Sequence, residues 1–543
     1  MNSDLVLSFI TSLLITMALI PALRLLAERF HFMDQPGERK VHQHPIPRIG
    51  GIAFGIGAIA SILWWVPKSS TTLSVLVGGL IILGFGVWDD RANLGYRIKL
   101  LGQLIAALAI TIGGIRFESI PFLLDAELPL WIGIPVTVFF LLAASNAVNL
   151  TDGLDGLAGG LSFLTFCGIA YLAYLTNNSM VLFLAIPFLG GVLGFLRYNT
   201  YPARIFMGDS GSQLLGFIMG VLAILLTNST SGPFSPVLSL FLLGLPFLDT
   251  LGVSVQRLVE GRSPFIGDRT HLHHKLMTAG LSHYEAVTAI YALQAGMVGS
   301  AYLLRWQSDT LIVPLYLLLA GAVLVLYVAA GRGLIPHPAP QSVRVRSNRW
   351  LSEFLSGPWL RDVPIRFLAA VVPLFLIATV FLPKQVPEDV GYMSTALFAI
   401  LLIGLSFFPR FAPYFVRGGL YLGSTFLLYV SDSSWMQAVY PVPVTYHILF
   451  GAIAVMVLLC MRFNSHSRFQ TTPLDYLMVC LAVIFPFFPE VRADISAFGL
   501  FSAKLIVLFF SFELLLHAFA DRVRQLGLVS LWVLFGLGIR IWL

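Results

Sequence analysis

Two adjacent carboxylates, Asp89 and Asp90, directly follow the apolar run 83–88. Neighbouring carboxylates repel each other, and a pair at the edge of an apolar segment is costly unless a cation or a reaction uses it. Lys99 follows about two to three helical turns later, where its amine could face an anion. The pair predicts either a cation site or, in the simpler interpretation, a polar anchor at a helix end.

The segment 146–160 has the densest polar pattern in the chain. It joins two apolar runs and contains Asn149, Asp152 and Asp155 among closely spaced glycines. Glycines let backbone approach a ligand closely, and backbone N–H groups at a helix start bind phosphate. The spacing of the acids and the missing terminal glutamate exclude a calcium loop. A ligand site is therefore predicted here, with a purely structural turn as the alternative.

A third polar segment, 204–212, places Asp209 between Gly208 and Ser210 at the start of another apolar run. Aspartate and serine both cap helix N-termini well, so capping is one interpretation. Because two other carboxylate-bearing segments accompany it, we expect Asp209 to bind a ligand.

Three histidines, His271, His273 and His274, fall close together after Asp268 and Arg269. Such density suggests zinc, yet zinc sites usually add cysteine or carboxylate ligands at defined spacings, which are not evident here. Imidazoles beside arginine and lysine suit a diphosphate and sugar hydroxyls. We expect substrate binding, with metal ligation as the alternative.

The first polar segment of the chain, 34–48, is basic. Its compact patch consists of Arg39, Lys40 and His42, with Arg48 close behind. The patch predicts a contact with a lipid phosphate or, alternatively, a solvated anchor at the inner leaflet of a membrane.

These polar segments interrupt a very apolar chain. Of 543 residues, 57% are hydrophobic and only 11% are charged, whereas soluble domains carry roughly 25% charged residues. A spanning helix needs about 20 mostly apolar residues. We therefore expect an all-α polytopic membrane protein whose first part has about eleven spanning helices, near 5–28, 49–66, 71–88, 98–115, 129–148, 157–175, 180–197, 211–228, 235–256, 285–304 and 310–330.

If these runs alternate sides, the polar segments described above all fall on one face, together with most of the arginines and lysines between the runs. The positive-inside rule makes that face cytoplasmic and places the N-terminus outside. It also explains the net charge of +6 without nucleic-acid binding. The first run is too long for the core of a signal peptide, which predicts a permanent helix.

Three parts are expected along the chain. Residues 1–331 form the membrane domain that carries the polar segments, and 332–364 form a basic, proline-rich cytoplasmic linker. Residues 365–543 contain six or seven further apolar runs, near 366–382, 392–408, 418–430, 440–461, 474–489, 496–519 and 526–541. Because their loops have few carboxylates, we interpret them as an accessory membrane module of unknown role.

Taken together, carboxylates and basic side chains on one membrane face suit phosphoryl transfer. Carboxylates hold Mg²⁺, and Mg²⁺ with arginine, lysine and histidine holds a diphosphate. Such transfer depends on charge neutralisation and in-line positioning. The location at the membrane boundary suggests that one substrate is a lipid phosphate.

The motifs closely resemble those of the polyprenyl-phosphate N-acetylhexosamine-1-phosphate transferases, glycosyltransferase family 4. The matching pieces are Asp89-Asp90 with Leu94, Lys99 and Gln103, the run 146–160, the run 206–212, and 263–274. The resemblance covers roughly residues 1–330. It implies a bundle of ten or eleven helices with a cytoplasmic active-site cleft, and transfer of a sugar 1-phosphate from a UDP-sugar to a polyprenyl phosphate with release of UMP.

The same resemblance implies roles for single residues. Asp209 would be the principal Mg²⁺ ligand, with Mn²⁺ able to substitute, and Asp89 a second metal-site carboxylate or general base, with Asp90 beside it. Asp155 and Phe206 would contact the uracil. The remaining roles are a phosphate partner (Lys99), supports of the cleft (Asn149 and Asp152), and the loop that binds the sugar and the diphosphate (Asp268, Arg269, His271, His273 and His274).

The His-Leu-His-His form resembles the N-acetylglucosamine-type members rather than the peptidoglycan branch. It implies UDP-N-acetylglucosamine and undecaprenyl phosphate as substrates, in the assembly of a surface polysaccharide at a bacterial inner membrane. Gly267 departs from the proline usual before Asp-Arg, so another UDP-N-acetylhexosamine, such as a 6-deoxy sugar, stays open. A transporter is the remote alternative. The polar residues of a transporter should lie near the bilayer midplane, whereas the carboxylates of this chain lie at the ends of the predicted spans. The oligomeric state also stays open, a homodimer included.

Overall fold

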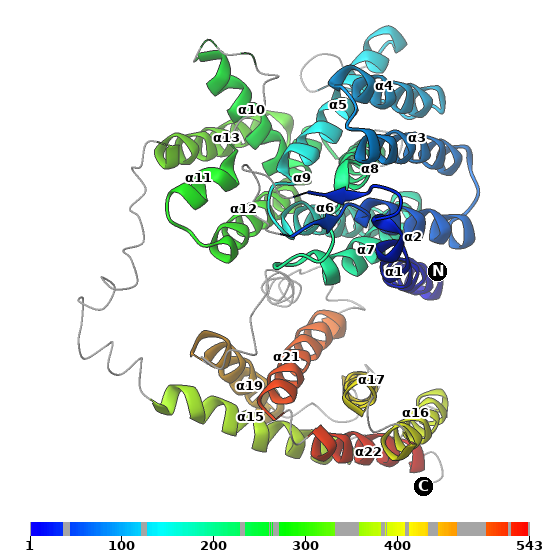
Figure 1. Ribbon diagram of the computed structural model, residues 1–543, viewed down its shortest axis with the longest axis vertical. Helices are drawn as coiled ribbons and strands as arrows, with labels where there is room; N and C mark the ends of the chain where they lie inside the picture. Colours follow the sequence, from blue (N-terminus) through cyan, green and yellow to red (C-terminus); the bar gives the residue numbers. More distant parts are fainter. Residues whose placement is uncertain are drawn as a thin grey trace, which may run out of the picture. The chain divides into compact units, whose positions relative to one another are not determined.

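The computed structural model describes residues 2–35, 44–120, 128–228, 234–259, 261, 263, 271–331, 358–381, 386, 388–407, 412–432, 444–463, 496–519 and 523–540. Almost all of its regular structure is helical, apart from one short two-stranded sheet (Figure 1). Nine of the described helices are long and apolar enough to cross a membrane. The predicted all-α polytopic membrane fold is thereby confirmed.

The N-terminal unit comprises residues 1–338 together with 472–474. Its first eight helices follow the predicted apolar runs to within a few residues: α1 (Asn2–Ala27), α2 (Gly50–Trp65), α3 (Ser70–Ala92), α4 (Tyr96–Ile112), α5 (Leu130–Thr151), α6 (Leu157–Leu175), α7 (Ser179–Asn199) and α8 (Gly208–Thr227).

The second half of this unit departs from the expected pattern. The run 235–256 is not one helix but two, α9 (Leu238–Leu242) and α10 (Gly244–Val259). A short helix, α11 (Leu272–Thr278), forms where a loop was expected, and α12 (His283–Leu304) and α13 (Asp309–Gly331) complete the unit.

Helix α8 is the centre of the N-terminal unit and is buried along nearly its whole length. It packs against α2, α3, α5 and α6. The contact with α3 is very close, because a Cβ placed on Gly86 would lie 2.3 Å from Ser210 Cα. Small residues allow such close approach of membrane helices. The N-terminus of α8 is therefore held directly against the end of α3.

A small sheet joins the first polar segment to this centre. Strands β1 (Met33–Asp34) and β2 (Ile46–Pro47) pair antiparallel. Beyond β2, the Phe206 N–H donates to Pro47 O at 2.7 Å, and the Gly50 N–H donates to Phe206 O at 2.9 Å. The segment before α8 is thus fixed to the segment before α2.

The C-terminal unit comprises residues 339–471 and 475–543. Its described helices are α15 (Pro358–Thr379), α16 (Glu388–Phe407), α17 (Ala412–Asp432), α19 (Val444–Phe463), α21 (Ser496–Ala518) and α22 (Val523–Ile539). They share an apolar core of their own, in which Leu376, Val416 and Leu537 are buried. The run predicted at 474–489 and most of the linker 332–364 lie outside the described residues.

Candidate functional site

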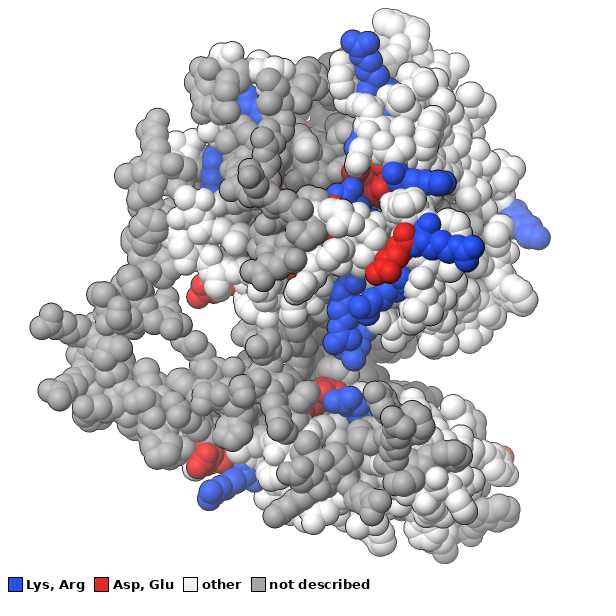
Figure 2. Space-filling view, viewed as in Figure 1, with Lys and Arg blue, Asp and Glu red and all other residues white. Residues whose placement is uncertain are grey.

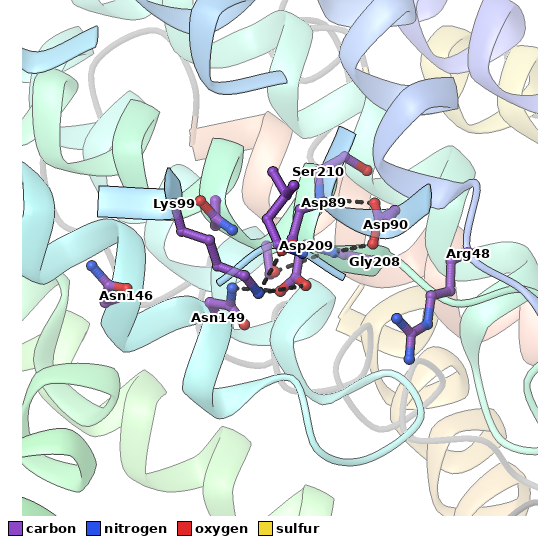
Figure 3. Close-up of polar contacts among 12 residues, drawn as sticks. Arg48, Asp89, Asp90, Lys99, Asn146, Asn149, Gly208, Asp209 and Ser210 are labelled. Atoms are coloured by element: carbon purple, nitrogen blue, oxygen red, sulfur yellow. Dashed lines mark hydrogen bonds and ion pairs between the residues drawn. The ribbon is translucent and has the colours of Figure 1, made fainter. Parts of the chain in front are cut away.

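Four side chains meet at the N-terminus of α8: one each from α3, α4 and α5, and one from α8 itself (Figure 3). Asp209 Oδ1 accepts a hydrogen bond from Asn149 Nδ2 at 2.6 Å, and its Oδ2 lies 3.2 Å from Lys99 Nζ. The same ammonium lies 2.5 Å from Asp89 Oδ2. Asp89 is almost fully buried and accepts the Leu94 N–H at 2.7 Å. We call these four residues, Asp89, Lys99, Asn149 and Asp209, the acidic centre.

Asp90 lies beside Asp89 in sequence but has a different environment. Its Oδ1 accepts the Asp209 N–H at 2.7 Å and its Oδ2 accepts the Ser210 N–H at 3.0 Å. Both carboxylate oxygens thus cap the first turn of α8, where a negative charge also meets the positive end of the helix dipole. Gly208 has φ +74°, and a Cβ there would lie 2.5 Å from Asp90 Oδ2, so only glycine fits this turn.

A layer of buried amides supports the acidic centre. Gln103 Nε2 donates to Gln213 Oε1 at 3.0 Å, and Asn146 Nδ2 donates to Gln103 Oε1 at 2.7 Å. Gln103 and Gln213 are almost completely buried. Because the three amides come from α4, α8 and α5, they fix the helices that carry Lys99 and Asp209.

The loop between α5 and α6 brings Asp152 and Asp155 beside this centre. Asp155 Oδ2 accepts the Ala203 N–H at 2.9 Å. The loop is held from behind by Asn199, whose Oδ1 accepts the Gly156 N–H at 3.0 Å. Burial and, after it, the neighbouring carboxylates, Asp209 first, raise the pKa of Asp152 to about 7. Asp152 therefore titrates near neutrality in the metal-free protein.

The histidine segment reaches the same region from α11. His274 lines the cleft described below, whereas His273 is buried and its ring packs at a tilt of 42° against that of His274, with centroids 4.2 Å apart. Burial lowers the pKa of His273 to about 3, so its ring is neutral at physiological pH. His271 is buried and pairs with Asp249 on α10.

Some predicted site residues cannot be placed. Arg39, Lys40 and His42 of the basic patch, and Asp268 and Arg269 of the histidine segment, lie outside the described residues. Their predicted roles stay predictions.

A cleft of about 750 Å³ opens beside the acidic centre. Asn149, Asp152, Asp155, Phe206 and Asp209, all predicted from sequence, line one part of it. Figure 2 shows basic and acidic side chains together on one face of the N-terminal unit, whose described surface is otherwise mostly uncharged. Arg48, which belongs to the predicted basic patch, also lines the cleft. Further basic side chains line it that were not assigned to the site from sequence: Arg24, His44, Arg204 and His283.

The side chains of the acidic centre suit Mg²⁺. Among the described residues, no group of three or more His, Cys, Asp or Glu side chains is arranged to hold a metal ion. Mg²⁺ is usually bound by one or two carboxylates together with waters and substrate phosphates. Asp89 and Asp209 fit that arrangement, because both carboxylates already pair with one cation, the Lys99 ammonium.

Four positioning side chains were missed by sequence reasoning: Asn199, Gln213, Asp249 and His283. Asn199 and Gln213 are neutral amides in or beside apolar runs, which give no chemical signal of their own. Asp249 was detectable, because it is a single carboxylate within the run 235–256, and charges inside apolar segments are usually functional.

The chain is similar to several known proteins. Residues 72–227, which include the whole acidic centre, match the model of glycosyl transferase family 4. The chain is 35% identical over 333 residues to a probable undecaprenyl-phosphate N-acetylglucosaminyl 1-phosphate transferase of Bacillus subtilis, a match that covers 61% of this chain and 92% of the relative.

Two more distant relatives have related names. A decaprenyl-phosphate N-acetylglucosaminephosphotransferase of Mycolicibacterium smegmatis is 34% identical over 328 residues, covering 53% of this chain and 79% of that protein. An undecaprenyl-phosphate alpha-N-acetylglucosaminyl 1-phosphate transferase of Escherichia coli K12 is 29% identical over 287 residues, covering 51% and 77%.

Proposed function

This chain belongs to glycosyl transferase family 4, and on that premise we propose that it transfers N-acetylglucosamine 1-phosphate from the UDP-sugar to undecaprenyl phosphate and releases UMP. The names of its relatives support the general reaction, transfer of a sugar 1-phosphate to a polyprenyl phosphate. The identity of the sugar and of the donor nucleotide is part of the proposal. The reaction takes place at the cytoplasmic face of a bacterial inner membrane, as the first membrane step of surface-polysaccharide assembly.

The observation that carries this proposal is the acidic centre at the edge of the cleft. Asp209 is held by Asn149 and Lys99, so its carboxylate is oriented before any substrate binds. Asp209 and Asp89 would hold Mg²⁺, which supplies charge neutralisation on the diphosphate when bound. Lys99 lies between the two carboxylates and is placed to meet a phosphate oxygen.

The transfer needs little covalent chemistry from the protein. An oxygen of the lipid phosphate attacks the phosphorus that carries the sugar, and the bond from that phosphorus to the bridging oxygen breaks. UMP leaves with the bridging oxygen. The protein has to hold both phosphates in line and to offset their charge.

Asp89 is better suited to holding charge than to removing a proton. Its Oδ1 accepts the Leu94 N–H and its Oδ2 pairs with Lys99. The second pKa of a phosphate monoester is about 6, so the lipid phosphate is already mostly ionised at neutral pH. We therefore assign Asp89 to the metal site; a base role would require Asp89→Asn to lose activity even at pH 8, where the attacking phosphate is fully ionised.

The uridine would bind between Asp155 and Phe206 in the same cleft. Both residues line it. The Asp155 carboxylate is oriented by the Ala203 N–H, and the Phe206 backbone is bonded to the segment before α2. His274 lines the same cleft and is placed for contact with the sugar or the diphosphate.

The test is transfer of radiolabel from UDP-N-acetylglucosamine into lipid by the purified full chain with undecaprenyl phosphate and Mg²⁺. We expect labelled lipid and released UMP, both lost with EDTA and with Asp209→Asn. Thr278→Ala is the matched control, because its hydroxyl donates to His274 O on the exposed side of α11. Product from another UDP-N-acetylhexosamine alone would change the sugar, and no product from any donor would overturn the proposal.

A further inference from the structure

Asp249 is a buried carboxylate in the N-terminal unit that the proposed mechanism does not use. It lies on α10 with 4% of its surface exposed. Its Oδ2 is 2.8 Å from His271 Nδ1, and its Oδ1 accepts the Leu272 N–H at 2.8 Å. Both oxygens are therefore directed at the first residues of the histidine helix α11.

These two bonds replace the cap that α11 otherwise lacks. The first N–H groups of any helix need acceptors, yet His271, at the N-cap position, makes no capping hydrogen bond with its own side chain. The Asp249 carboxylate supplies the acceptor from another helix, and a negative charge there also suits the helix dipole. The start of α11 is thus fixed to α10, the helix that precedes it in the chain.

The helix fixed in this way presents two histidines to the proposed site. His274 lines the cleft. His273 is buried against the loop that carries Asp152 and Asp155, since a Cβ placed on Gly153 would lie 2.2 Å from His273 Nε2. The rings of His271 and His273 are nearly parallel, with centroids 5.9 Å apart. A shift of His271 would therefore move the rings that contact the loop and the cleft.

We propose that Asp249 is a positioning residue for the transfer reaction. This inference rests on the proposed function. It orients His271 by accepting a hydrogen bond from Nδ1, and it fixes α11 so that His273 and His274 meet the 152–155 loop and the cleft. Asp249 touches no substrate. Its effect on catalysis passes through the histidines.

The substitution Asp249→Asn separates this role from simple packing. Asparagine has nearly the same shape, but its side chain has one acceptor oxygen in place of two. If that oxygen keeps the Leu272 N–H, the amide NH₂ faces His271 Nδ1, and the imidazole proton has to move to Nε2. The variant is therefore expected to fold while holding His271 in the wrong tautomer.

The experiment uses the purified full chain in lipid nanodiscs. We expect Asp249→Asn to lower kcat per folded molecule at least tenfold and to change the KM for undecaprenyl phosphate less than threefold. The double variant Asp249→Asn/His271→Ala should be no slower than the slower single variant, because the two residues act as one unit. Thr250→Val is the matched control on α10, since no partner for its buried hydroxyl is found among the described residues.

A second readout does not depend on turnover. Hydrogen–deuterium exchange of peptides covering 271–279 should be faster in Asp249→Ala than in wild type and unchanged in Thr250→Val. Asp249→Asn with wild-type kcat, or a double variant whose loss equals the product of the single losses, would overturn the inference. If wild type transfers no sugar phosphate, the proposed function fails, and the exchange rates alone decide: faster exchange in Asp249→Ala supports the positioning of α11 by Asp249, and unchanged exchange overturns it.

Discussion

The adjacent aspartates Asp89 and Asp90 make different contacts in this site. Asp89 and Asp90 are indistinguishable as a sequence pair, and the sequence predicted a single cation site for both. In the structure Asp89 faces Lys99, whereas Asp90 binds two backbone N–H groups of α8. Spacing predicts that both carboxylates lie at the membrane boundary. It cannot predict which one turns toward a neighbouring helix, because that depends on how α3 packs against α8.

The capping role of Asp90 predicts a loss of stability. Asp90→Ala leaves the Asp209 and Ser210 N–H groups without their acceptors, and loss of an N-cap costs about 1–2 kcal/mol. We expect a lower melting temperature in detergent, measured by intrinsic fluorescence. Asp90→Asn, which can still accept one bond, should fall between wild type and Asp90→Ala. An unchanged melting temperature for Asp90→Ala would show that the cap contributes nothing.

Asp152 predicts a pH dependence of stability in the metal-free protein. Its pKa is raised from 3.8 to about 7, so the folded state binds the proton more tightly than the unfolded state. The wild type should therefore lose stability as the pH rises from about 4 through about 7, when the carboxyl ionises against its neighbours. Asp152→Asn stays neutral, so its stability relative to wild type should rise over that range.

Chemical unfolding with EDTA present, at pH 5 and pH 8, measures this difference. The difference between Asp152→Asn and wild type should be larger at pH 8. Thr176→Val, whose hydroxyl bonds only to backbone carbonyls at the far end of α6, should show no such change between the two values. A difference that shrinks toward pH 8 would contradict the raised pKa.

At the scale of elements, the sequence predicts helix positions well and helix interruptions poorly. Helices α2 to α8 begin and end within a few residues of the apolar runs, because length and hydropathy determine a membrane helix. The interruption between α9 and α10 was missed. An average of hydropathy over the run does not detect the break. The break depends on a side chain elsewhere that forms hydrogen bonds with the backbone N–H and C=O groups left unpaired there.

That side chain is Gln294 on α12, which is completely buried. Its Oε1 accepts the Leu245 N–H at 3.0 Å, and its Nε2 donates to Leu242 O at 2.8 Å and to Thr165 Oγ1 at 2.9 Å. One side chain thus binds backbone groups on both sides of the break. The direction of α10, and with it the place of Asp249, depends on this amide.

Gln294→Leu is therefore expected to destabilise the N-terminal unit. It leaves the buried Leu245 N–H without its acceptor in an apolar interior, at a cost of roughly 1–3 kcal/mol. Leu242 O loses the Gln294 amide but still accepts the Thr165 hydroxyl at 2.9 Å. The melting temperature should fall, and kcat per folded molecule should fall as well because α10 carries Asp249. Ser300→Ala, on the exposed side of α12, is the matched control. If Gln294→Leu kept the wild-type melting temperature but had a lower kcat, Gln294 would set the direction of α10 without contributing to stability.

At the scale of the whole molecule, the chain comprises two helical units with separate cores. The C-terminal unit has polar contacts inside it, since Arg417 on α17 pairs with Glu513 on α21, which also accepts a hydrogen bond from Tyr421. These contacts join two helices of the same unit. The sequence predicted the unit but assigned it no chemistry, and its role stays open.

The orientation of the N-terminal unit in the membrane is the remaining prediction. Alternating spans and the positive-inside rule place the α3–α4 connection in the cytoplasm and the α2–α3 connection outside. Tyr96 is the first residue of α4, directly after the first connection, and Lys68 lies in the second; both are exposed. In a chain whose native cysteines are replaced by serine, we expect an impermeant maleimide to label Lys68→Cys in intact spheroplasts. Tyr96→Cys should be labelled only after the membrane is opened, and the reverse pattern would place the acidic centre on the outer face, where a cytoplasmic UDP-sugar cannot reach it.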